Sequence, residues 1–372
     1  MSISSVPQIT SFLSDRIAAH DFPSAVYLVA ENGQAVFADA LGDAVVEPYR
    51  IAAKLNTIYD LASLTKPLIT GLLCTIRIER GELRLEQQLS ELLREFIGTD
   101  KAAVTIQQLL THSSGMAAWR PLYVLAKGNR DDVLRIIATE PLECPPATRV
   151  IYSDLNFITL GILLERISGK RLHQLGTDEI FRPLGLKETY FNPEAALQTG
   201  IAASELGNLF EQNTVGISAS SYKDWRTRMI WGEVHDGNAN FLGGSAGHAG
   251  LFSTAAETAQ IASQFLASES KLLAPETCRL FNTNFTAGLN EARSIAWQLA
   301  ETHLSTAGPS LPASSFGHTG FTGTSCWIDP NNNRVFVLLT NRTHVRELPF
   351  ANINSVRRQF HTLAVAALDS RK

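Results

Sequence analysis

A serine and a lysine three residues apart, Ser63 and Lys66, stand where an extended run of the sequence gives way to an apolar helix. Residues at this spacing share one face of a helix, so both side chains project from the same side of the first turn. A lysine can take the proton of a serine hydroxyl if its charged form is disfavoured, and a helix N-terminus favours negative charge. The pair predicts a nucleophilic serine, although the same spacing also occurs on ordinary solvated helices.

The composition is that of an ordinary globular protein. The chain has 372 residues, 45% hydrophobic and 18% charged, with a net charge of −4. This length exceeds the roughly 100–200 residues of one domain, so we expect two domains, or one domain with an insertion. The sequence has no basic stretch that would indicate nucleic-acid binding and no apolar run near the roughly 18 residues of a membrane span.

The first 22 residues lack the basic head, continuous apolar run and small-residue cleavage site of a secretory signal. We therefore expect a cytoplasmic protein for the chain as given, or a periplasmic one if a leader segment has been removed. The four cysteines are far apart and follow no CxxC spacing. This favours buried free thiols over a zinc site or a disulfide framework.

Hydrophobic periodicity predicts a helix and a hairpin in the first part of the chain. Apolar residues recur at helical spacing over 9–18, and two β-rich runs then flank Asn32-Gly33, a strong hairpin dipeptide. After the Ser-Lys pair, an apolar stripe over 68–76 predicts a helix that ends near Gly81. Because this helix is so apolar, we expect it to be packed on most sides.

The end of the chain returns to strands. The runs 325–330 and 334–341 are β-rich and are separated by the turn-forming cluster 329–333, and a helix is predicted over about 353–368. Before them, Thr254 and a glutamate three residues later have the pattern of a capping box, which predicts a helix whose apolar face includes residues 261, 265 and 266.

The middle of the chain is different. From about 83 to 187 the pattern is helical with short breaks and contains no clear strand, with Thr105 as a cap and a longer helix that ends at Gly169. The segment 188–250 is rich in Gly, Asn and Ser and is expected to be loop-heavy.

These patterns predict an α/β (α+β) protein in which an antiparallel sheet flanked by helices carries an inserted, mostly α-helical domain. Residues 1–80 and 250–372 would form the sheet domain, and residues 81–249 the inserted helical and loop-rich domain. Because clefts between domains are favoured sites for ligands, we expect the active site between the two.

Three further stretches bear on the Ser-Lys pair. A Tyr-Ser-Asp motif at 152–154 precedes a helix, a His-Thr-Gly motif at 318–320 begins a β-rich run, and residues 109–116 form a polar turn after an apolar helix. Taken singly, they are also typical of a packing tyrosine, a surface histidine and a simple loop. The glycine of the second motif would allow a ligand to approach the strand edge closely.

The order and spacing of these motifs resemble those of the serine β-lactamase and penicillin-binding-protein superfamily, which combines SxxK, a second polar motif and a KTG-type strand. The resemblance is closest to the class C β-lactamase branch, which includes D-alanyl-D-alanine carboxypeptidases, D-aminopeptidases and family VIII carboxylesterases. There the second motif is Tyr-x-Asn, matched by 152–154, and the KTG position is often HxG, matched by 318–320. The likeness covers about residues 23–345 and implies a β-lactamase/transpeptidase-like fold.

The resemblance implies a role for each matching residue. Ser63 would attack a carbonyl and carry the acyl group. Lys66 and Tyr152 would share the work of the base, with the lysine charge lowering the phenol pKa from its usual value of about 10. The backbone N–H groups of Ser63 and Phe321 would form the oxyanion hole, worth about 10² to 10³ in rate per donor. His318 would share in proton transfer or, when protonated, bind a substrate carboxylate.

Two departures from the family pattern matter. Asp154 replaces the usual Asn, and its carboxylate would accept from Lys66, hold that lysine charged and shift the base role toward Tyr152. It also disfavours a nearby anionic substrate. His318 replaces a lysine and weakens the fixed positive charge that β-lactamases use to hold the antibiotic's carboxylate. Both departures argue against an efficient β-lactamase, although carboxypeptidases with HTG exist in the family.

A further group of residues is expected to contact the substrate or to support the site. Its members are Asp154, Thr319, Gly320, Trp119, Arg120, His235 and His248. Two histidines and Asp236 could also ligate zinc, but their spacing matches no usual site, and similar stretches occur in metal-free relatives. We therefore expect neither a metal nor another cofactor.

We expect a serine hydrolase that acts through a covalent acyl-enzyme on a small ester or amide, that is, a β-lactamase-related esterase or peptidase. One alternative is a D-alanyl-D-alanine carboxypeptidase or a weak class C-like β-lactamase. Another is a penicillin-binding sensor that is acylated without turnover. The expected partner is a small acyl substrate. Its identity depends on loop shapes around the cleft, and no motif determines the oligomeric state.

Overall fold

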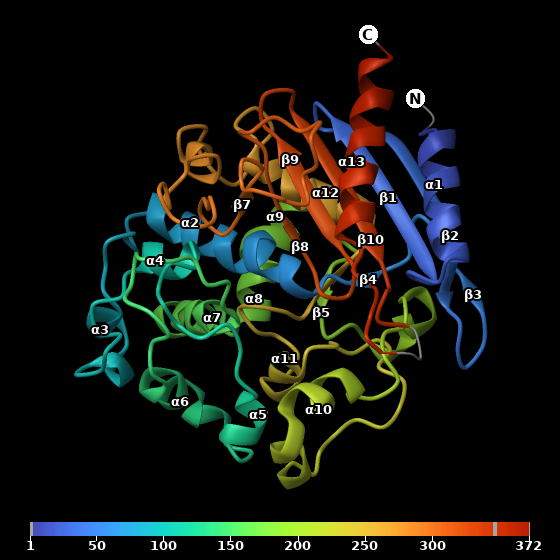
Figure 1. Cartoon of the computed structure of the whole chain (residues 1–372). Coiled ribbons are helices and arrows are strands. Elements are labelled where there is room, and N and C mark those ends of the chain that lie inside the picture. The colour runs from blue at the N-terminus through green and yellow to red at the C-terminus, as the bar shows by residue number, and fades with distance from the viewer. Residues whose placement is uncertain (1–2, 345–347, 372) are drawn as a thin grey trace.

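The computed structural model describes residues 3–344 and 348–371. A seven-stranded antiparallel sheet runs through the molecule in the order β3-β2-β1-β10-β9-β8-β7 (Figure 1). Its strands all come from the two terminal parts of the chain: β1 (Ser24–Glu31), β2 (Gln34–Val45), β3 (Ile51–Ala52), β7 (Gln298–Leu299), β8 (Phe316–Thr319), β9 (Ser325–Asp329) and β10 (Arg334–Thr340). The predicted antiparallel sheet with flanking helices is confirmed.

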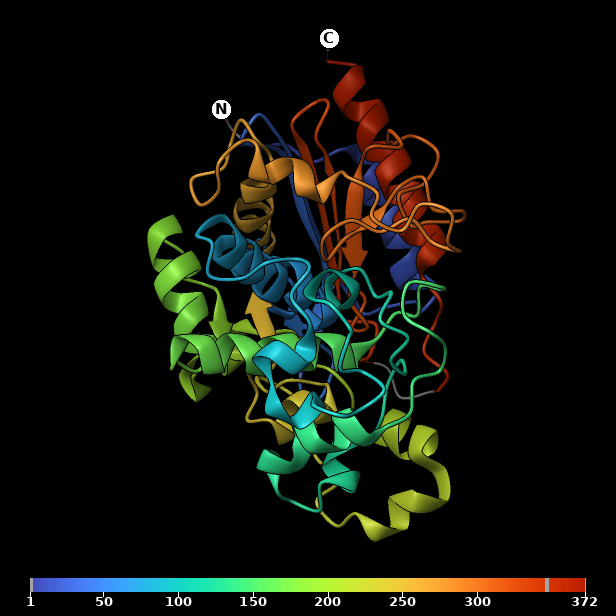
Figure 2. The ribbon, with the colours of Figure 1, turned by 90° about the vertical axis from the view of Figure 1, so that its left-hand side faces the viewer.

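Nearly every residue of the central strands β1 and β10 is buried. Because successive side chains of a strand point to opposite sides, both faces of these strands are covered. In β1, Val26 and Leu28 enter one core, whereas Tyr27 and Val29 enter another. The helices α1 (Pro7–Ala18) and α13 (Asn354–Asp369) cover the second side, and α12 (Ala255–Ala262) packs on the first. Figure 2 shows the sheet between the red helix α13 and the gold helix α12.

Turn chemistry explains the hairpins at both ends of the chain. Asn32 and Gly33, between β1 and β2, have φ values of 51° and 70°, the left-handed conformation that a two-residue hairpin turn requires. At the other end, the cluster 329–333 joins β9 to β10, and α13 follows. The helix, the two hairpins and the tail helix predicted from the pattern are all present.

The middle of the chain is helical. Residues 83–187, all of them described, contain no strand. Thr105 caps one of the helices by accepting from the backbone of Gln108, and Gly169, with φ 68°, ends the longest one. The helices of this segment are α3 (Leu89–Leu92), α4 (Ile106–Leu110), α5 (Leu122–Leu125), α6 (Val133–Thr139), α7 (Asp154–Ser168), α8 (Leu172–Gly176) and α9 (Arg182–Leu184).

A second sheet of three short strands links distant segments. Its order is β4-β6-β5, formed by β4 (Tyr59–Asp60), β5 (Tyr190–Phe191) and β6 (Leu251–Ser253). The rest of the segment 188–250 is largely loop, with the short helices α10 (Leu209–Val215) and α11 (Gly237–Phe241). β5 belongs to the predicted insertion but pairs with β6 beyond it, and the boundaries at 80/81 and 249/250 stay a prediction.

The capping box predicted at Thr254 is only half present. Thr254 Oγ1 accepts from the backbone N–H of Glu257, 3.3 Å away. The Glu257 carboxylate does not return to the cap, because it accepts from the backbone N–H groups of Lys187 and Glu188 instead. The predicted helix is also shorter than expected, since α12 ends at Ala262 and gives way to a 3₁₀ turn.

The apolar helix after the Ser-Lys pair is the most enclosed element of the chain. It starts as a π-helical stretch, Lys66–Gly71, and continues as α2 (Leu72–Glu79), and every residue from 66 to 77 is buried. Within the described residues, no helix combines the length and apolarity needed to cross a bilayer. The predicted burial of this helix on most sides is confirmed.

Candidate active site

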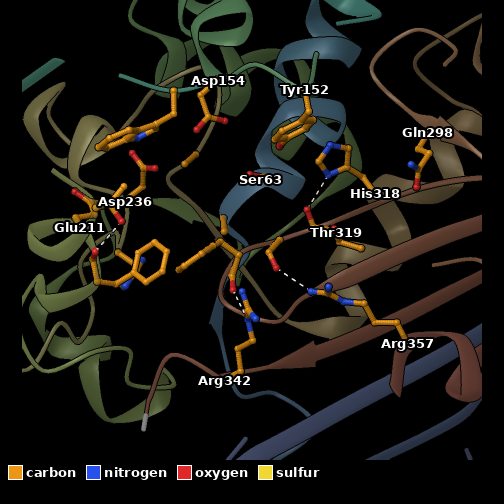
Figure 3. A pocket seen from close by; sticks show the side chains of 18 of the residues that line it. Ser63, Tyr152, Asp154, Glu211, Asp236, Gln298, His318, Thr319, Arg342 and Arg357 are labelled. Atoms are coloured by element: carbon orange, nitrogen blue, oxygen red, sulfur yellow. Dashed lines mark hydrogen bonds between the residues drawn. The ribbon is translucent and has the colours of Figure 1, made fainter. Parts of the chain in front are cut away.

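Ser63 sits in a tight turn between β4 and the buried helix. Its neighbour Ala62 has a φ of 47°, a left-handed conformation that costs an L-residue about 1–2 kcal/mol. The buried carboxylate of Asp60 stabilises this turn, because Oδ1 accepts from the Ala62 N–H (2.9 Å) and Oδ2 from the His235 N–H (2.8 Å). The turn places Ser63 in the wall of a pocket of about 550 Å³ (Figure 3).

Lys66 is fully buried and reaches Ser63 from the next turn. Its Nζ donates to Ser63 Oγ at 2.9 Å and to the His248 carbonyl at 3.2 Å, and it lies 2.7 Å from Asp154 Oδ1. Burial has the largest single effect and lowers the pKa of Lys66, but the charge and hydrogen bond of Asp154, together with the interactions of Tyr152, raise it by more, so the net pKa is raised. Lys66 is therefore an ammonium in the resting state and a donor to Ser63, not a base.

Tyr152 lies two residues before α7, with its ring centroid 4.9 Å from Lys66 Nζ. Its hydroxyl oxygen is buried and has no hydrogen-bond partner of normal geometry in the described part of the chain. Burial raises the pKa of Tyr152 by more than the Lys66 charge lowers it. The expectation of a lowered phenol pKa is therefore wrong for the resting state, because desolvation outweighs the ammonium.

His318 is a buried, neutral imidazole. Its Nδ1 donates to the Thr319 carbonyl at 2.9 Å, which leaves the Nε2 lone pair buried and without a partner among the described residues. The ring lies 5.6 Å from that of Tyr152. Burial lowers the pKa of His318 well below its usual value, and the charges of Arg293 and Lys66 add to this. A protonated His318 that holds a substrate carboxylate, one of its two predicted roles, does not fit this environment.

The His-Thr-Gly motif ends strand β8 instead of beginning a strand, which corrects the prediction. The turn that follows is tied to the backbone just before the serine. Thr322 Oγ1 donates to the Asp60 carbonyl (2.7 Å), and Thr324 Oγ1 donates to the Leu61 carbonyl (3.0 Å). A Cβ at Gly320 would lie 2.0 Å from Thr324 Oγ1, so the approach of the two turns requires glycine here.

This contact brings Phe321 to the pocket that Ser63 lines. The Phe321 N–H has no hydrogen-bond acceptor within residues 3–344 and 348–371, whereas its carbonyl accepts from Arg342 Nε at 2.7 Å. Arg342 therefore fixes the backbone at Phe321, and the Phe321 N–H remains available to a substrate oxygen. The oxyanion-hole role of Ser63 and Phe321 fits this geometry and stays a prediction.

Comparisons with known proteins agree with this architecture. A family model described as Beta-lactamase matches residues 9–357. The chain is 30% identical to a putative D-alanyl-D-alanine carboxypeptidase of Escherichia coli K12, over 87% of this chain and 79% of that protein. It is also 30% identical to an N-acetylmuramyl-L-alanine amidase of Bacillus subtilis 168, over 89% and 79%. The chain belongs to the β-lactamase family.

Solved structures share the fold of this chain. A penicillin-binding-protein homologue from Caulobacter crescentus superposes with a TM-score of 0.74 at 18% identity, over 98% of this chain and 99% of that one. The family model and the relatives at 30% identity confirm the resemblance to this superfamily stated from the motifs. Like its relatives, this β-lactamase-family protein is a serine hydrolase of the kind that works through an acyl-enzyme.

Three arginines that the sequence analysis did not single out line the pocket of this β-lactamase-family hydrolase: Arg293, Arg342 and Arg357. Arg357 projects from α13, and its Nη2 donates to the Gly320 and Thr324 carbonyls at 2.9 and 3.0 Å. Burial lowers the pKa of Arg357 to about 9 and that of Arg342 to about 10, so both stay charged at neutral pH. Neither forms an ion pair with a carboxylate in the described residues.

The sequence did contain a signal for one of these arginines. Arg357 stands on the same face of the predicted tail helix as the buried Phe360 and Ala364. A charged residue on an apolar face needs buried partners. Arg293 lies in an irregular segment, and its sequence neighbourhood carries no comparable signal.

Acidic side chains lie on another side of the pocket, where Figure 3 shows Glu211, Asp236 and Asp154 near one another. His235 and His248, which the sequence analysis considered together, bond to different carboxylates. His235 Nε2 bonds to Glu205 at 2.8 Å, whereas His248 Nε2 bonds to Asp236 Oδ1 at 2.8 Å.

Ligand atoms of Asp154, Asp236 and His248 do lie within 4.8 Å of one another. Asp236 and His248 are, however, already bonded to each other, and Asp154 pairs with Lys66. Hydrogen bonds and this ion pair therefore account for the arrangement of these three side chains.

The other predicted residues fall into two groups. Trp119, Thr319, Gly320 and His235 line the pocket, as expected of residues that contact a substrate. Arg120 is not among the lining residues, and its side chain pairs with carboxylates at positions 140 and 143.

The polar turn 109–116 supports the site indirectly. His112 Nδ1 accepts from the Ser153 N–H at 3.0 Å, and its ring packs against that of Tyr152, 4.6 Å away. Burial lowers the pKa of His112 well below its usual value, and the charges of Arg293 and Lys66 act in the same direction. A neutral imidazole therefore helps to orient the tyrosine motif.

Proposed function

We propose that Ser63 is the acyl-carrying nucleophile of a hydrolase for small amides and esters. The observation that carries this proposal is the position of Lys66 Nζ, 2.9 Å from Ser63 Oγ, inside a pocket that Tyr152 and His318 also line. Ser63 attacks the carbonyl of the substrate, the leaving group departs with a proton, and water then cleaves the acyl-enzyme. The N–H groups of Ser63 and Phe321 stabilise the developing oxyanion.

In this proposal the proton of Ser63 passes to Tyr152. The raised pKa of Tyr152 means that its hydroxyl is protonated at rest, so it accepts a proton only as it releases its own. The lone pair of His318 Nε2 is buried, has no partner in the described chain and belongs to a ring 5.6 Å from that of Tyr152. This nitrogen is the proposed receiver, and Lys66 contributes its positive charge.

The test of the nucleophile is direct. Incubation with a phosphonate or a penicillin should add the mass of one inhibitor fragment to Ser63, and Ser63→Ala should lose p-nitrophenyl ester turnover. Ser14→Ala, a change of an exposed serine in α1, is the matched control and should keep full activity. Turnover that survives in Ser63→Ala, or a wild type that hydrolyses no activated ester, would contradict the proposal.

A second candidate, D-alanyl-D-alanine carboxypeptidase, is favoured by the arginines. Arg342 and Arg357 place two positive charges beside the His-Thr-Gly turn without carboxylate partners in residues 3–344 and 348–371. They can replace the charge that is missing at His318 and hold the C-terminal carboxylate of a peptide. The relative from Escherichia coli carries this name.

A substrate panel separates these candidates. We expect D-alanyl peptides to exceed nitrocefin in kcat/KM, with p-nitrophenyl esters as the reference for intrinsic reactivity. A penicillin-binding sensor would instead hold its acyl group for hours without deacylation. For a cytoplasmic protein, the location predicted for the chain as given, cell-wall peptides would have to be recycled fragments.

A further inference from the structure

Glu211 is a buried carboxyl in the pocket wall that no lysine or arginine of the described residues neutralises. The residue is 7% exposed and belongs to α10. Its Oε1 accepts from the Gly237 N–H at 2.7 Å, whereas Oε2 is buried and has no hydrogen bond of normal geometry in the described part of the chain. The Tyr123 hydroxyl is its polar neighbour. No lysine or arginine of the described residues forms an ion pair with it.

The space for this carboxyl is provided by a glycine. A Cβ at Gly237 would lie 2.1 Å from Glu211 Oε2. The backbone of α11 can therefore approach the carboxylate only because position 237 has no side chain. A bound N–H and a missing Cβ together hold the carboxyl in one place.

The surroundings of Glu211 add negative charge. Burial opposes the ionisation of Asp236, but His248, the Ala239 N–H and the Lys66 charge together outweigh burial and lower the pKa of Asp236 below its usual range. Burial and the Asp236 charge raise the pKa of Glu211 to about 7, while His235, the Gly237 N–H and Tyr123 act in the opposite direction. Two carboxyls with too little positive charge between them favour a bound cation.

We propose that Glu211 binds a primary ammonium group on the acyl part of the substrate. The inference rests on the proposed hydrolase function of this pocket. Figure 3 shows Glu211 and Asp236 on one side of Ser63, and His318, Gln298 and Arg357 on the other. If the arginine side takes the carboxylate of the leaving group, the acidic side faces the acyl part. The substrate class is then an amino-acyl ester or amide with a free amine.

A pair of substrates that differ only in the amine tests this selection. The p-nitrophenyl esters of alanine and of N-acetylalanine, in D and L forms, have the same reacting carbonyl and leaving group. At pH 7.5, above the pKa of about 7 of Glu211, the wild type should prefer the free amine at least tenfold in kcat/KM for one enantiomer. Glu211→Gln keeps the shape and removes the charge, so it should reduce this ratio at least tenfold, mainly through KM.

Two further variants complete the test. Gly237→Ala keeps the Glu211 charge but displaces the carboxyl, and it should reduce the ratio as well. Glu276→Gln removes a charge from an exposed surface glutamate and should leave the ratio and the activity unchanged. Circular dichroism of each variant shows whether it is folded.

The possible outcomes are distinct. If the wild type hydrolyses both esters equally well, or if Glu211→Gln keeps the preference for the amine, the proposed ammonium site is wrong while the hydrolase function stands. If neither ester is hydrolysed and Ser63 is not acylated by a phosphonate, the proposed function itself fails, and the ammonium site fails with it.

Discussion

At the scale of single residues, the charge state of Lys66 decides how the site can work. Asp154 lies 2.7 Å from its Nζ and holds the buried lysine as an ammonium. In the relatives to which the motifs were compared, an Asn at this place carries no charge. The charge of the aspartate raises the pKa of both Lys66 and Tyr152, and therefore favours the protonated form of each.

Asp154→Asn should therefore shift the pH dependence of acylation. Without the carboxylate, burial dominates at Lys66, so its pKa falls, and the pKa of Tyr152 falls as well because a neighbouring negative charge is gone. Lys66 then loses its positive charge, which the proposed proton transfer uses, at a lower pH. We expect the falling limb of kcat/KM against pH for a p-nitrophenyl ester, which reports the loss of this charge, to move by at least one unit toward acid.

Asp131→Asn, a change of an exposed aspartate outside this pocket, is the control for this shift and should leave the profile in place. A limb that stays in place in Asp154→Asn as well, or moves toward alkali, would show that Asp154 does not set the charge state of Lys66.

At the scale of elements, a glycine-rich loop before β6 packs between the buried helix that follows Ser63 and helix α7. A Cβ at Gly247 would lie 1.9 Å from the Phe157 carbonyl of α7. The Gly247 carbonyl accepts from Thr70 Oγ1 at 2.7 Å, and the next carbonyl, that of His248, accepts from Lys66. The loop thus joins the segment that carries Lys66 to the helix that begins at Asp154.

Gly247→Ala should destabilise the protein and slow catalysis. The methyl group meets backbone that cannot rotate away, and overpacking of this kind costs about 1–3 kcal/mol. We expect a loss of that size in the free energy of unfolding, measured by urea denaturation, together with a lower kcat because the Lys66 contact shifts. Gly200→Ala is the matched control, since no atom lies within 4 Å of a Cβ there and stability should not change.

Equal stability of the two glycine variants would show that the loop can move away from α7 and make room for the added methyl group. A stable Gly247→Ala with reduced kcat would separate the positioning of Lys66 from the packing.

At the scale of the whole molecule, the sheet divides two cores, and α13 carries polar groups into the second one. His361 is fully buried there, with Nδ1 donating to the Thr306 carbonyl at 2.9 Å. Burial lowers its pKa to about 3. In the unfolded chain a histidine titrates near 6.5, so folding requires this side chain to stay neutral.

Stability should therefore fall as the protein is acidified below about pH 6.5. The unfolded chain then binds a proton at His361 that the folded protein refuses until about pH 3, and one such group contributes up to about 1.4 kcal/mol per pH unit. Urea unfolding between pH 7.5 and 5 should show this slope, to which His112 and His318 add. His361→Asn should flatten the slope by one proton.

His20→Asn, at an exposed histidine, should leave the slope unchanged. An unaltered slope in His361→Asn would show that His361 does not contribute to the acid sensitivity.

The sequence alone determined the local part of this protein. Hydrophobic period, turn dipeptides and caps depend on neighbouring residues, and they predicted the antiparallel sheet, its hairpins and the buried helix after Ser63. The order of the motifs likewise predicted that Tyr152 and His318 would meet this serine, and all three line one pocket. The predicted roles of these residues await experiment.

The electrostatics of the site, in contrast, depend on contacts between distant parts of the chain. Whether Lys66 is charged depends on burial and on Asp154, 88 positions further along the chain, and His318 is neutral because the packed protein excludes water from it. Glu211, a carboxyl without a basic partner in the described residues, and the arginines on the other side likewise become candidates for substrate binding only because the fold places them in one pocket. The charge state of a side chain is set by its burial and by the charges around it, and the spacing of residues along the chain does not determine these.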